Sequence, residues 1–310
     1  MSTSADKKPV IRSLQKILPA ESVLYEAEDL RPYECDGLSA YQQVPMVVVL
    51  PETIKQIEDV LSFCSNQKIP VVARGAGTGL SGGALPLADG VLMSLAKFNR
   101  ILNIDTDNLT ARIQPGVRNL AISEAASSYG LYYAPDPSSQ IACSIGGNVA
   151  ENAGGVHCLK YGLTVHNILK LDVITMKGEH LSIGSDALDS PGYDLLALMT
   201  GSEGLLGVIT EITVKLLPKP EAANVILAAF GDVATAGQAV SNVIAVGILP
   251  AGLELMDNAA IRAADDFVNA GYPRDAAAIL LCEIDGTMAE VTDQLERAQQ
   301  VLRVSGATEI

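Results

Sequence analysis

Two apolar runs of strand length flank a helical pattern in the first third of the chain. Residues 46–50 form the first run and residues 70–73 form the second. Between them, apolar residues over 54–64 recur with the 3.6-residue period of an amphipathic helix. Thr53 and Gln56 open this pattern with the spacing of a capping box. The pattern predicts a β-α-β unit, and the handedness of such units predicts that its two strands run parallel.

Alternating apolar and polar positions predict further strands in the middle of the chain, with two helices among them. Asp107 and Asn108 are placed as a hairpin turn between two of these strands. We expect strands at 91–95, 101–105, 110–114, 169–176, 180–183 and 208–217, and helices at 119–129 and 194–199.

The last third of the chain has the pattern of a separate α+β domain, and the run from Pro218 to Pro220 marks the predicted boundary. We expect strands at 224–230, 252–256 and 276–285, and helices at 233–246 and 288–304. The predicted organisation is a helical lead-in at 1–44, a first domain at 45–220 with subdomains of about 45–100 and 101–220, and a partial second domain at 222–310.

The composition is that of a folded protein and argues against several classes of partner. Apolar residues make up 48% of the 310 residues and charged residues 18%, the opposite of a disordered chain. The net charge of −15 leaves no large basic patch, which argues against nucleic acid as a partner. The five cysteines contain no CxxC pair, and no metal site is predicted. The sequence has no secretory signal and no transmembrane segment, so we expect a cytoplasmic chain, peripheral to the inner membrane through partners.

Glycine clusters in three segments, at 74–83, 146–155 and 201–207. Glycine allows positive φ angles and close backbone approach, and successive N–H groups of such loops hold phosphate oxygens. A P-loop is excluded because no Gly-Lys-Ser/Thr follows. Gly77, Gly79 and Gly82 have the spacing of the dinucleotide fingerprint, but residues 83–86 prevent the long helix that it needs. A pyrophosphate-binding loop of a flavin domain and three ordinary turns remain as alternatives.

Four motifs in order resemble those of the vanillyl-alcohol-oxidase type (PCMH-type) FAD-binding flavoproteins. The motifs lie at 70–83, 135–139, 143–155 and 201–211. The similarity covers roughly residues 35–310 and is greatest to the group that contains the flavin subunit of bacterial glycolate oxidase and the D-lactate dehydrogenases. The resemblance implies an α+β fold: a two-subdomain PCMH-type FAD-binding domain followed by an incomplete ferredoxin-like α+β substrate (cap) domain.

The resemblance also implies which residues bind FAD. The first loop would carry the pyrophosphate, and the other motifs would line and close over the flavin or pack its adenine end. The residues so implied are Arg74, Gly75, Ala76, Gly77, Thr78, Gly79, Leu80, Ser81, Pro135, Asp136, Ser138, Ser139, Ser144, Ile145, Gly146, Gly147, Asn148, Asn152, Gly154, Gly155, Glu203, Gly204, Gly207, Val208 and Ile209. Some relatives attach the flavin through a histidine in the first loop. Thr78 stands near that place, so we expect non-covalent FAD.

The activity implied by the resemblance is FAD-dependent oxidation of a small 2-hydroxy acid, glycolate or D-lactate, to the 2-oxo acid. Electrons would pass to a partner subunit or to quinone, and the implied partners are the iron–sulfur and second flavin-type subunits of a glycolate oxidase complex. The alternative is a non-catalytic FAD-binding subunit or fragment that lacks the substrate site.

The chain departs from the family in its second domain. Relatives carry their substrate-binding arginine, a metal-ligating histidine pair and the catalytic histidine in Gly-His-x-Gly-Asp-Gly-Asn and Gly-Glu-His-Gly motifs, and this chain contains neither. It ends at Ile310, inside the expected substrate domain, so we expect a C-terminal truncation. The catalytic residue is therefore unassigned. His157 is a candidate base or a bystander beside the cofactor, and Arg262 and Arg274 are the candidates for pairing with the carboxylate. We expect FAD binding without reduction by either acid.

Overall fold

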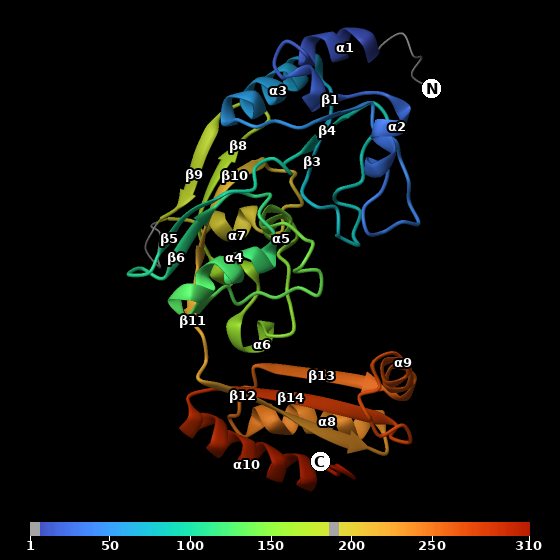
Figure 1. Cartoon of the computed structure of the whole chain (residues 1–310), viewed down its shortest axis with the longest axis vertical. Helices are drawn as coiled ribbons and strands as arrows, with labels where there is room; N and C mark the ends of the chain where they lie inside the picture. The colour runs from blue at the N-terminus through green and yellow to red at the C-terminus, as the bar shows by residue number, and fades with distance from the viewer. Residues whose placement is uncertain (1–6, 186–191) are drawn as a thin grey trace. The chain divides into compact units, whose positions relative to one another are not determined.

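The computed structural model describes residues 7–185 and 192–310, and the chain divides into two compact units. Unit 1 consists of Met1–Ala153 and Leu163–Leu217, and unit 2 consists of Gly154–Gly162 and Pro218–Ile310. Each unit has its own sheets and its own hydrophobic core (Figure 1). The predicted domain boundaries stay a prediction.

A four-stranded sheet in the order β1-β2-β4-β3 forms the first part of unit 1. Its strands are β1 (Val23–Leu24), β2 (Val47–Val49), β3 (Val71–Arg74) and β4 (Val91–Ser94). Strand β4 pairs parallel with both β2 and β3. The predicted parallel direction of β2 and β3 is therefore confirmed, with β4 inserted between them. Strand β1 pairs antiparallel with β2; it was not predicted, because two residues are too few to show an alternating pattern.

Helix α3 (Ile54–Gln67) packs on this sheet and has the predicted N-terminus. The Gln56 backbone N–H donates to the Thr53 hydroxyl, and the Gln56 side chain accepts from the Thr53 N–H, so the capping box is present. The apolar stripe of the helix is buried against β2 and β4. The residues before the sheet contain α1 (Lys7–Leu14), η1 (Ala20–Ser22), α2 (Ala27–Leu30) and η2 (Arg31–Tyr33).

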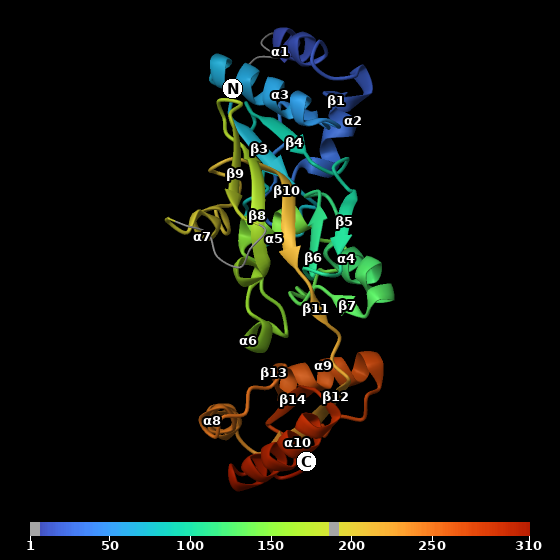
Figure 2. The ribbon, with the colours of Figure 1, turned by 90° about the vertical axis from the view of Figure 1, so that its left-hand side faces the viewer.

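A five-stranded antiparallel sheet, in the order β5-β6-β10-β8-β9, forms the second part of unit 1 (Figure 2). Its strands are β5 (Ile101–Asp105), β6 (Thr110–Ile113), β8 (Ile168–Ile174), β9 (His180–Gly184) and β10 (Val208–Lys215). The strands carry a core shared with α4 (Asn119–Ala126), α5 (Ile145–Glu151) and α7 (Leu195–Met199). Short elements connect these pieces: η3 (Ser127–Tyr129), β7 (Leu131–Tyr132), η4 (Thr164–Asn167) and β11 (Leu217–Pro218).

Helix α5 corrects the reading of the second glycine-rich segment as a loop. The Ser144 hydroxyl accepts from the Gly147 N–H and caps the helix. A Cβ at Gly146 would lie 2.5 Å from Pro115 Cβ, so this glycine lets the helix approach the chain before α4. Close packing outweighs the low helix propensity of two glycines, and sequence propensity alone does not reveal such a contact.

Unit 2 is a three-stranded antiparallel sheet in the order β12-β14-β13. Its elements are α6 (Cys158–Tyr161), β12 (Ala222–Phe230), α8 (Val233–Ala245), β13 (Gly252–Asp257), α9 (Asn258–Val268), β14 (Ala278–Gly286) and α10 (Met288–Val304). Helices α8 and α10 share a core with one face of this sheet (Figure 1). The strand order and the positions of α8 and α10 are those of a ferredoxin-like domain, with α9 inserted.

The other face of this sheet carries α9 and the short segment 154–162. Side chains alternate along β14, so Cys282 and Ile284 point into the α8–α10 core while Glu283 and Asp285 lie on the opposite face. Helix α9 was not predicted. The helical signal was present in the sequence, because apolar residues recur at spacings of three and four and Asp257 is the N-cap; the apolar positions are Ala260, Ile261, Ala264, Phe267 and Val268.

Candidate cofactor site

A cleft in unit 1 lies between the loop that follows β3 and helix α5. It encloses about 980 Å³ of space, part of it open to solvent. The structure brings the three glycine-rich segments together here, although the first and the third are more than a hundred residues apart in the sequence. The predicted residues that line the cleft are Arg74, Gly75, Ala76, Gly77, Thr78, Gly79, Ser139, Ser144, Gly146, Gly147, Asn148, Glu203, Gly204, Gly207 and Ile209.

Ten other predicted residues do not line the cleft: Leu80, Ser81, Pro135, Asp136, Ser138, Ile145, Asn152, Gly154, Gly155 and Val208. Ile145 and Val208 belong to the hydrophobic cores. Leu80 is 72% exposed. Asn152 ends α5 in a left-handed conformation, and its side chain accepts from the Val165 N–H at 3.0 Å. Gly154 and Gly155 belong to unit 2.

Sequence reasoning missed several residues that line the cleft: Ala73, Gly83, Ala84, Leu95, Pro115, Pro137, Cys143, Ala150, Glu151 and Ala153. Ala150 and Glu151 lie one turn after Gly147, so recognising α5 as a helix would have placed them at the cleft. Leu95 and Pro115 stand outside every motif, and their place follows only from the packing of the two sheets of unit 1.

The loop after β3 presents backbone donors to the cleft. In the described structure no protein acceptor faces the N–H groups of residues 76–81. Such unpaired donors favour a bound anion or water, because a backbone N–H rarely stays without a partner. Gly77 (φ +70°) and Gly82 (φ +83°) are left-handed, whereas Gly79 is not, and the protein leaves room for a side chain at Gly79. A Cβ at Gly79 would meet only the Glu151 carboxylate, at 3.8 Å.

Arg74 lies beneath this loop and is 8% exposed. Its Nη1 donates to the Ala84 carbonyl at 3.3 Å, which ties the start of the loop to its far end. A Cβ at Gly77 would lie 2.2 Å from Arg74 Nη2, so the loop folds directly over the guanidinium. Burial lowers the pKa of Arg74, and the nearby Asp36 carboxylate opposes that shift. The cation therefore stays charged at the floor of the cleft.

A buried amide pair joins α4 to α5 behind the cleft. Asn119 Nδ2 donates to the Pro135 carbonyl and to Asn148 Oδ1, both at 3.0 Å. Asn148 Nδ2 in turn contacts Cys143 Sγ at 3.3 Å. These bonds fix residues 135–139, the second motif, against α5, which carries the third motif. Breaking them would leave a buried amide without partners, which is costly.

Two carboxylates lie at the end of the glycine loop, where a Cβ at Gly83 would be 2.7 Å from Glu151 Oε1 and 3.5 Å from Glu203 Oε2. Glu151 accepts from the Ser81 hydroxyl at 2.7 Å, which links α5 to the loop. Glu203 has φ +52°, an uncommon conformation for a residue with a side chain, and it lines the cleft beside Gly204. Carboxylates accept hydrogen bonds from hydroxyl and amino groups, so these two suit the hydroxyl or amino groups of a nucleotide and not its phosphates.

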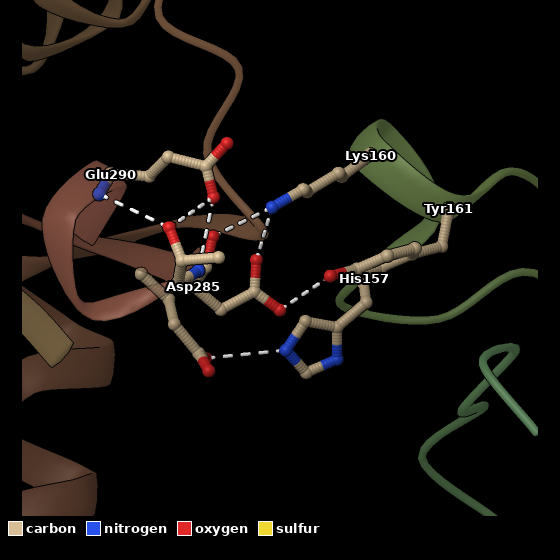
Figure 3. Close-up of polar contacts among 7 residues, drawn as sticks. His157, Lys160, Tyr161, Asp285 and Glu290 are labelled. Carbon is tan, nitrogen blue, oxygen red and sulfur yellow. Dashed lines mark hydrogen bonds and ion pairs between the residues drawn. The ribbon is translucent and has the colours of Figure 1, made fainter. Parts of the chain in front are cut away.

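His157 lies in unit 2 and does not line this cleft. Its Nε2 lies 3.3 Å from Glu283 Oε2. Beside it, Lys160 forms an ion pair with Asp285, and the Tyr161 hydroxyl donates to the same carboxylate at 2.6 Å (Figure 3). Arg262 is bound to Asn258, and Arg274 pairs with Asp265 and Asp266. In the part of the chain that the structure describes, these groups hold unit 2 together.

Two features are absent from residues 7–185 and 192–310. No helix there combines the length and apolar character needed to span a membrane. Across the same residues, no group of three or more histidine, cysteine, aspartate or glutamate side chains is placed to hold a metal ion.

Comparisons with known proteins agree with the geometry of the cleft. A family model described as an FAD binding domain matches residues 45–184, and one described as FAD linked oxidases, C-terminal domain, matches residues 219–310. The chain belongs to the FAD-linked oxidases. FAD is therefore its cofactor.

Curated relatives of this FAD-linked oxidase include subunits of glycolate oxidase. Glycolate oxidase subunit GlcD of Escherichia coli (strain K12) is 61% identical over 305 residues, 98% of this chain and 61% of that protein. GlcD of Bacillus subtilis (strain 168) is 40% identical, over 90% of this chain and 59% of the relative. A D-lactate dehydrogenase of Anaerostipes hadrus is 34% identical, over 97% of this chain and 65% of the relative. The chain thus spans about three fifths of the length of these relatives.

Solved structures confirm the fold. Alkyldihydroxyacetonephosphate synthase superposes with a TM-score of 0.83 at 18% identity, covering 97% of this chain and 60% of that one. p-Cresol methylhydroxylase superposes with a TM-score of 0.81 at 19% identity, covering 97% and 65%. The predicted α+β class, with a PCMH-type domain followed by a second α+β domain, is confirmed.

The residues of the cleft fit FAD. The unpaired N–H groups of 76–81 suit the pyrophosphate, and Gly75 and Gly146 hold the walls at distances that a side chain would prevent. The two carboxylates provide acceptors for the hydroxyl groups of the nucleotide. These features together distinguish the site from three ordinary turns, which would not converge on one cleft.

Proposed function

We propose that this chain serves the FAD-dependent oxidation of a small 2-hydroxy acid, glycolate or D-lactate, to the 2-oxo acid. The observation that carries the proposal is the 61% identity with glycolate oxidase subunit GlcD over 98% of the chain. The 34% identity with a D-lactate dehydrogenase supports the same substrate class. The shared chemistry is a hydroxyl group next to a carboxylate.

In this proposal the residues of unit 1 bind and orient the cofactor. The N–H groups of 76–81 bind the pyrophosphate, Arg74 adds a positive charge beneath it, and Glu151 and Glu203 accept from hydroxyl groups. Bound FAD supplies the two-electron acceptor that amino-acid side chains cannot provide. The catalytic base is unassigned, since His157 is paired with Glu283 and no histidine in the described residues lines the cleft.

The partners in this proposal are the iron–sulfur and second flavin-type subunits of a glycolate oxidase complex. The Escherichia coli relative is a subunit of glycolate oxidase, which supports a multi-subunit assembly. We place the protein in the cytoplasm, peripheral to the inner membrane through those partners. The alternative function is a non-catalytic FAD-binding subunit or fragment.

A chimera tests the proposed substrate class. In it, this chain replaces the aligned 305 residues of the Escherichia coli GlcD subunit. With FAD bound and oxygen excluded, we expect glycolate or D-lactate to bleach the flavin absorbance band, and succinate, which lacks the hydroxyl group, to leave it unchanged. A chimera whose flavin is reduced by dithionite but by neither hydroxy acid would favour the alternative. The unmodified GlcD subunit is the control.

A further inference from the structure

The loop that binds the pyrophosphate has little support of its own. The described structure gives the N–H groups of residues 76–81 no protein acceptor, so hydrogen bonds within the loop do not fix its shape. Arg74 ties the start of the loop to Ala84. The middle of the loop, at Thr78 and Gly79, needs another support.

Gly37 supplies a contact at this point. A Cβ on Gly37 would lie 2.8 Å from the carbonyl oxygen of Thr78 and 2.8 Å from that of Gly79. Real Cβ atoms essentially never approach an oxygen this closely, so only glycine allows the two backbones to touch here. The φ of Gly37 lies outside the left-handed region. The requirement for glycine is therefore the contact and not the backbone conformation.

The same segment also contacts the start of the loop. The Tyr33 ring lies 5.8 Å from Arg74 Cζ, within cation–π range. Asp36 is 6% exposed, and one of its oxygens accepts from the Leu38 N–H at 2.9 Å. The other oxygen is buried and has no hydrogen-bond partner among the described residues. The charge of Asp36 acts on the Arg74 cation.

Residues 33–38 are themselves held in a closed loop. The Gln43 N–H donates to the Glu34 carbonyl at 2.7 Å, which brings the two ends of the following turn together. The Tyr41 N–H donates to the Leu38 carbonyl at 3.2 Å. A segment whose ends are fixed resists displacement where it contacts a neighbour, whereas a free terminal arm would move away.

We propose that residues 33–38 form a brace that holds the FAD-binding loop in its binding conformation, with Gly37 as the positioning residue. The proposal rests on FAD binding at this cleft. By fixing Thr78 and Gly79 from behind, the brace keeps the neighbouring N–H groups aligned before the cofactor arrives. A loop that is ordered in advance binds more tightly, because less conformational entropy is lost on binding.

The test is Gly37→Ala, with Gly231→Ala as the matched control. Gly231 lies in unit 2, has no left-handed φ, and a Cβ there meets nothing within 4 Å. Apoprotein is titrated with FAD, and quenching of flavin fluorescence gives the Kd. We expect Gly37→Ala to raise the Kd about tenfold or more and Gly231→Ala to leave it unchanged.

Thermal unfolding of the apoproteins separates positioning from a general folding defect. We expect the Tm of both variants to stay within about 2 °C of wild type, since the loop can shift when no cofactor is bound. Gly37→Ala with a wild-type Kd would overturn the brace. An equal increase of the Kd in Gly37→Ala and in the control Gly231→Ala would also overturn it.

A second pair of variants decides the question if Gly37→Ala does not fold. Tyr33→Leu removes the ring beside Arg74, and Tyr33→Phe keeps it. We expect the Kd for FAD to rise about threefold in Tyr33→Leu and to return to the wild-type value in Tyr33→Phe. Equal Kd values in the two would overturn the proposal. A wild-type chain that takes up no FAD would instead overturn FAD binding itself.

Discussion

Two independent features of the structure require glycine at position 77. Its φ of +70° is left-handed, and the space where a side chain would stand is filled by the Arg74 guanidinium. Gly82, five residues later, has the same kind of φ but open space around it. The pair separates the cost of the backbone conformation from the cost of moving the arginine.

We predict that Gly77→Ala largely abolishes FAD binding and that Gly82→Ala does not. Both variants place a Cβ on a left-handed residue, which costs about 1 kcal/mol of stability. Only the first also displaces Arg74 from the floor of the cleft. Flavin content per protein after purification is the measurement. Full flavin content in Gly77→Ala would contradict the position that we assign to Arg74.

At the residue scale, the sequence predicted the cleft through its glycines. A run such as 74–83 has few structural explanations, and each of them points to a ligand or to turns. The same reasoning did not find Leu95 or Pro115, because ordinary core residues reach a site only through packing. It also did not find Gly37, whose contact with Thr78 joins two positions that no motif relates.

At the scale of elements, α9 depends on the loop that follows it. Asp265, near the end of the helix, accepts from Arg274 at 2.9 Å and from the N–H groups of Gly271 and Tyr272 at 2.8 and 3.1 Å. The Arg274 hydrogen bond, followed by these backbone donors, lowers the pKa of Asp265 below its ordinary value of 3.8. The carboxylate thus holds helix and loop together in its ionised form.

We predict that the stabilising effect of Asp265 depends on pH. Its pKa is lower in the folded protein than in the unfolded chain, so its contribution is complete above the unfolded value and is lost as the pH falls through the folded value. The Tm difference between wild type and Asp265→Asn should be large at pH 7 and shrink below about pH 4. Asp275→Asn is the control, because Asp275 makes no hydrogen bond among the residues that the structure describes. A pH-independent difference would contradict the assignment.

Segment 154–162 is held on the sheet of unit 2 by Asp285, which is 5% exposed and binds both Lys160 and Tyr161 (Figure 3). We predict that Asp285→Asn speeds trypsin cleavage after Lys160, because the ion pair that holds the ammonium group is weakened. Limited proteolysis followed by mass spectrometry measures the rate. Asp293→Asn, which weakens the exposed pair with Arg297, is the control and should not change cleavage at Lys160.

The elements were predicted from sequence where a period was long enough to be seen. The capping box of α3, the hairpin of β5 and β6, and the strands and flanking helices of unit 2 all have such patterns. Strand β1 is too short, and α5 contains glycines whose contacts with Pro115 come from elsewhere in the chain. These two elements are stabilised by their neighbours and not by local preference. Helix α9 does have a local signal, an amphipathic pattern with Asp257 as its N-cap, which the sequence prediction omitted.

At the scale of the whole molecule, the proposed FAD site is built from three segments that are far apart in the sequence. Thr78 lines the cleft at a place where some relatives have an attaching histidine, and a threonine hydroxyl does not form that bond. We predict that the purified protein is yellow and that acid precipitation releases FAD into the supernatant. Absorbance of the supernatant is the measurement. Colour that stays in the pellet would show a covalent bond.

The position of β10 has a consequence for the order in which the protein is made. Strand β10 lies between β6 and β8 at the centre of its sheet, although it is the last strand of that sheet to leave the ribosome. Until residues 208–215 have been synthesised, β6 and β8 have no partner between them, and Gly207 and Ile209 are not yet at the cleft. The lining of the cleft is therefore incomplete when the first glycine loop emerges. It becomes complete only when the sheet closes, more than a hundred residues later.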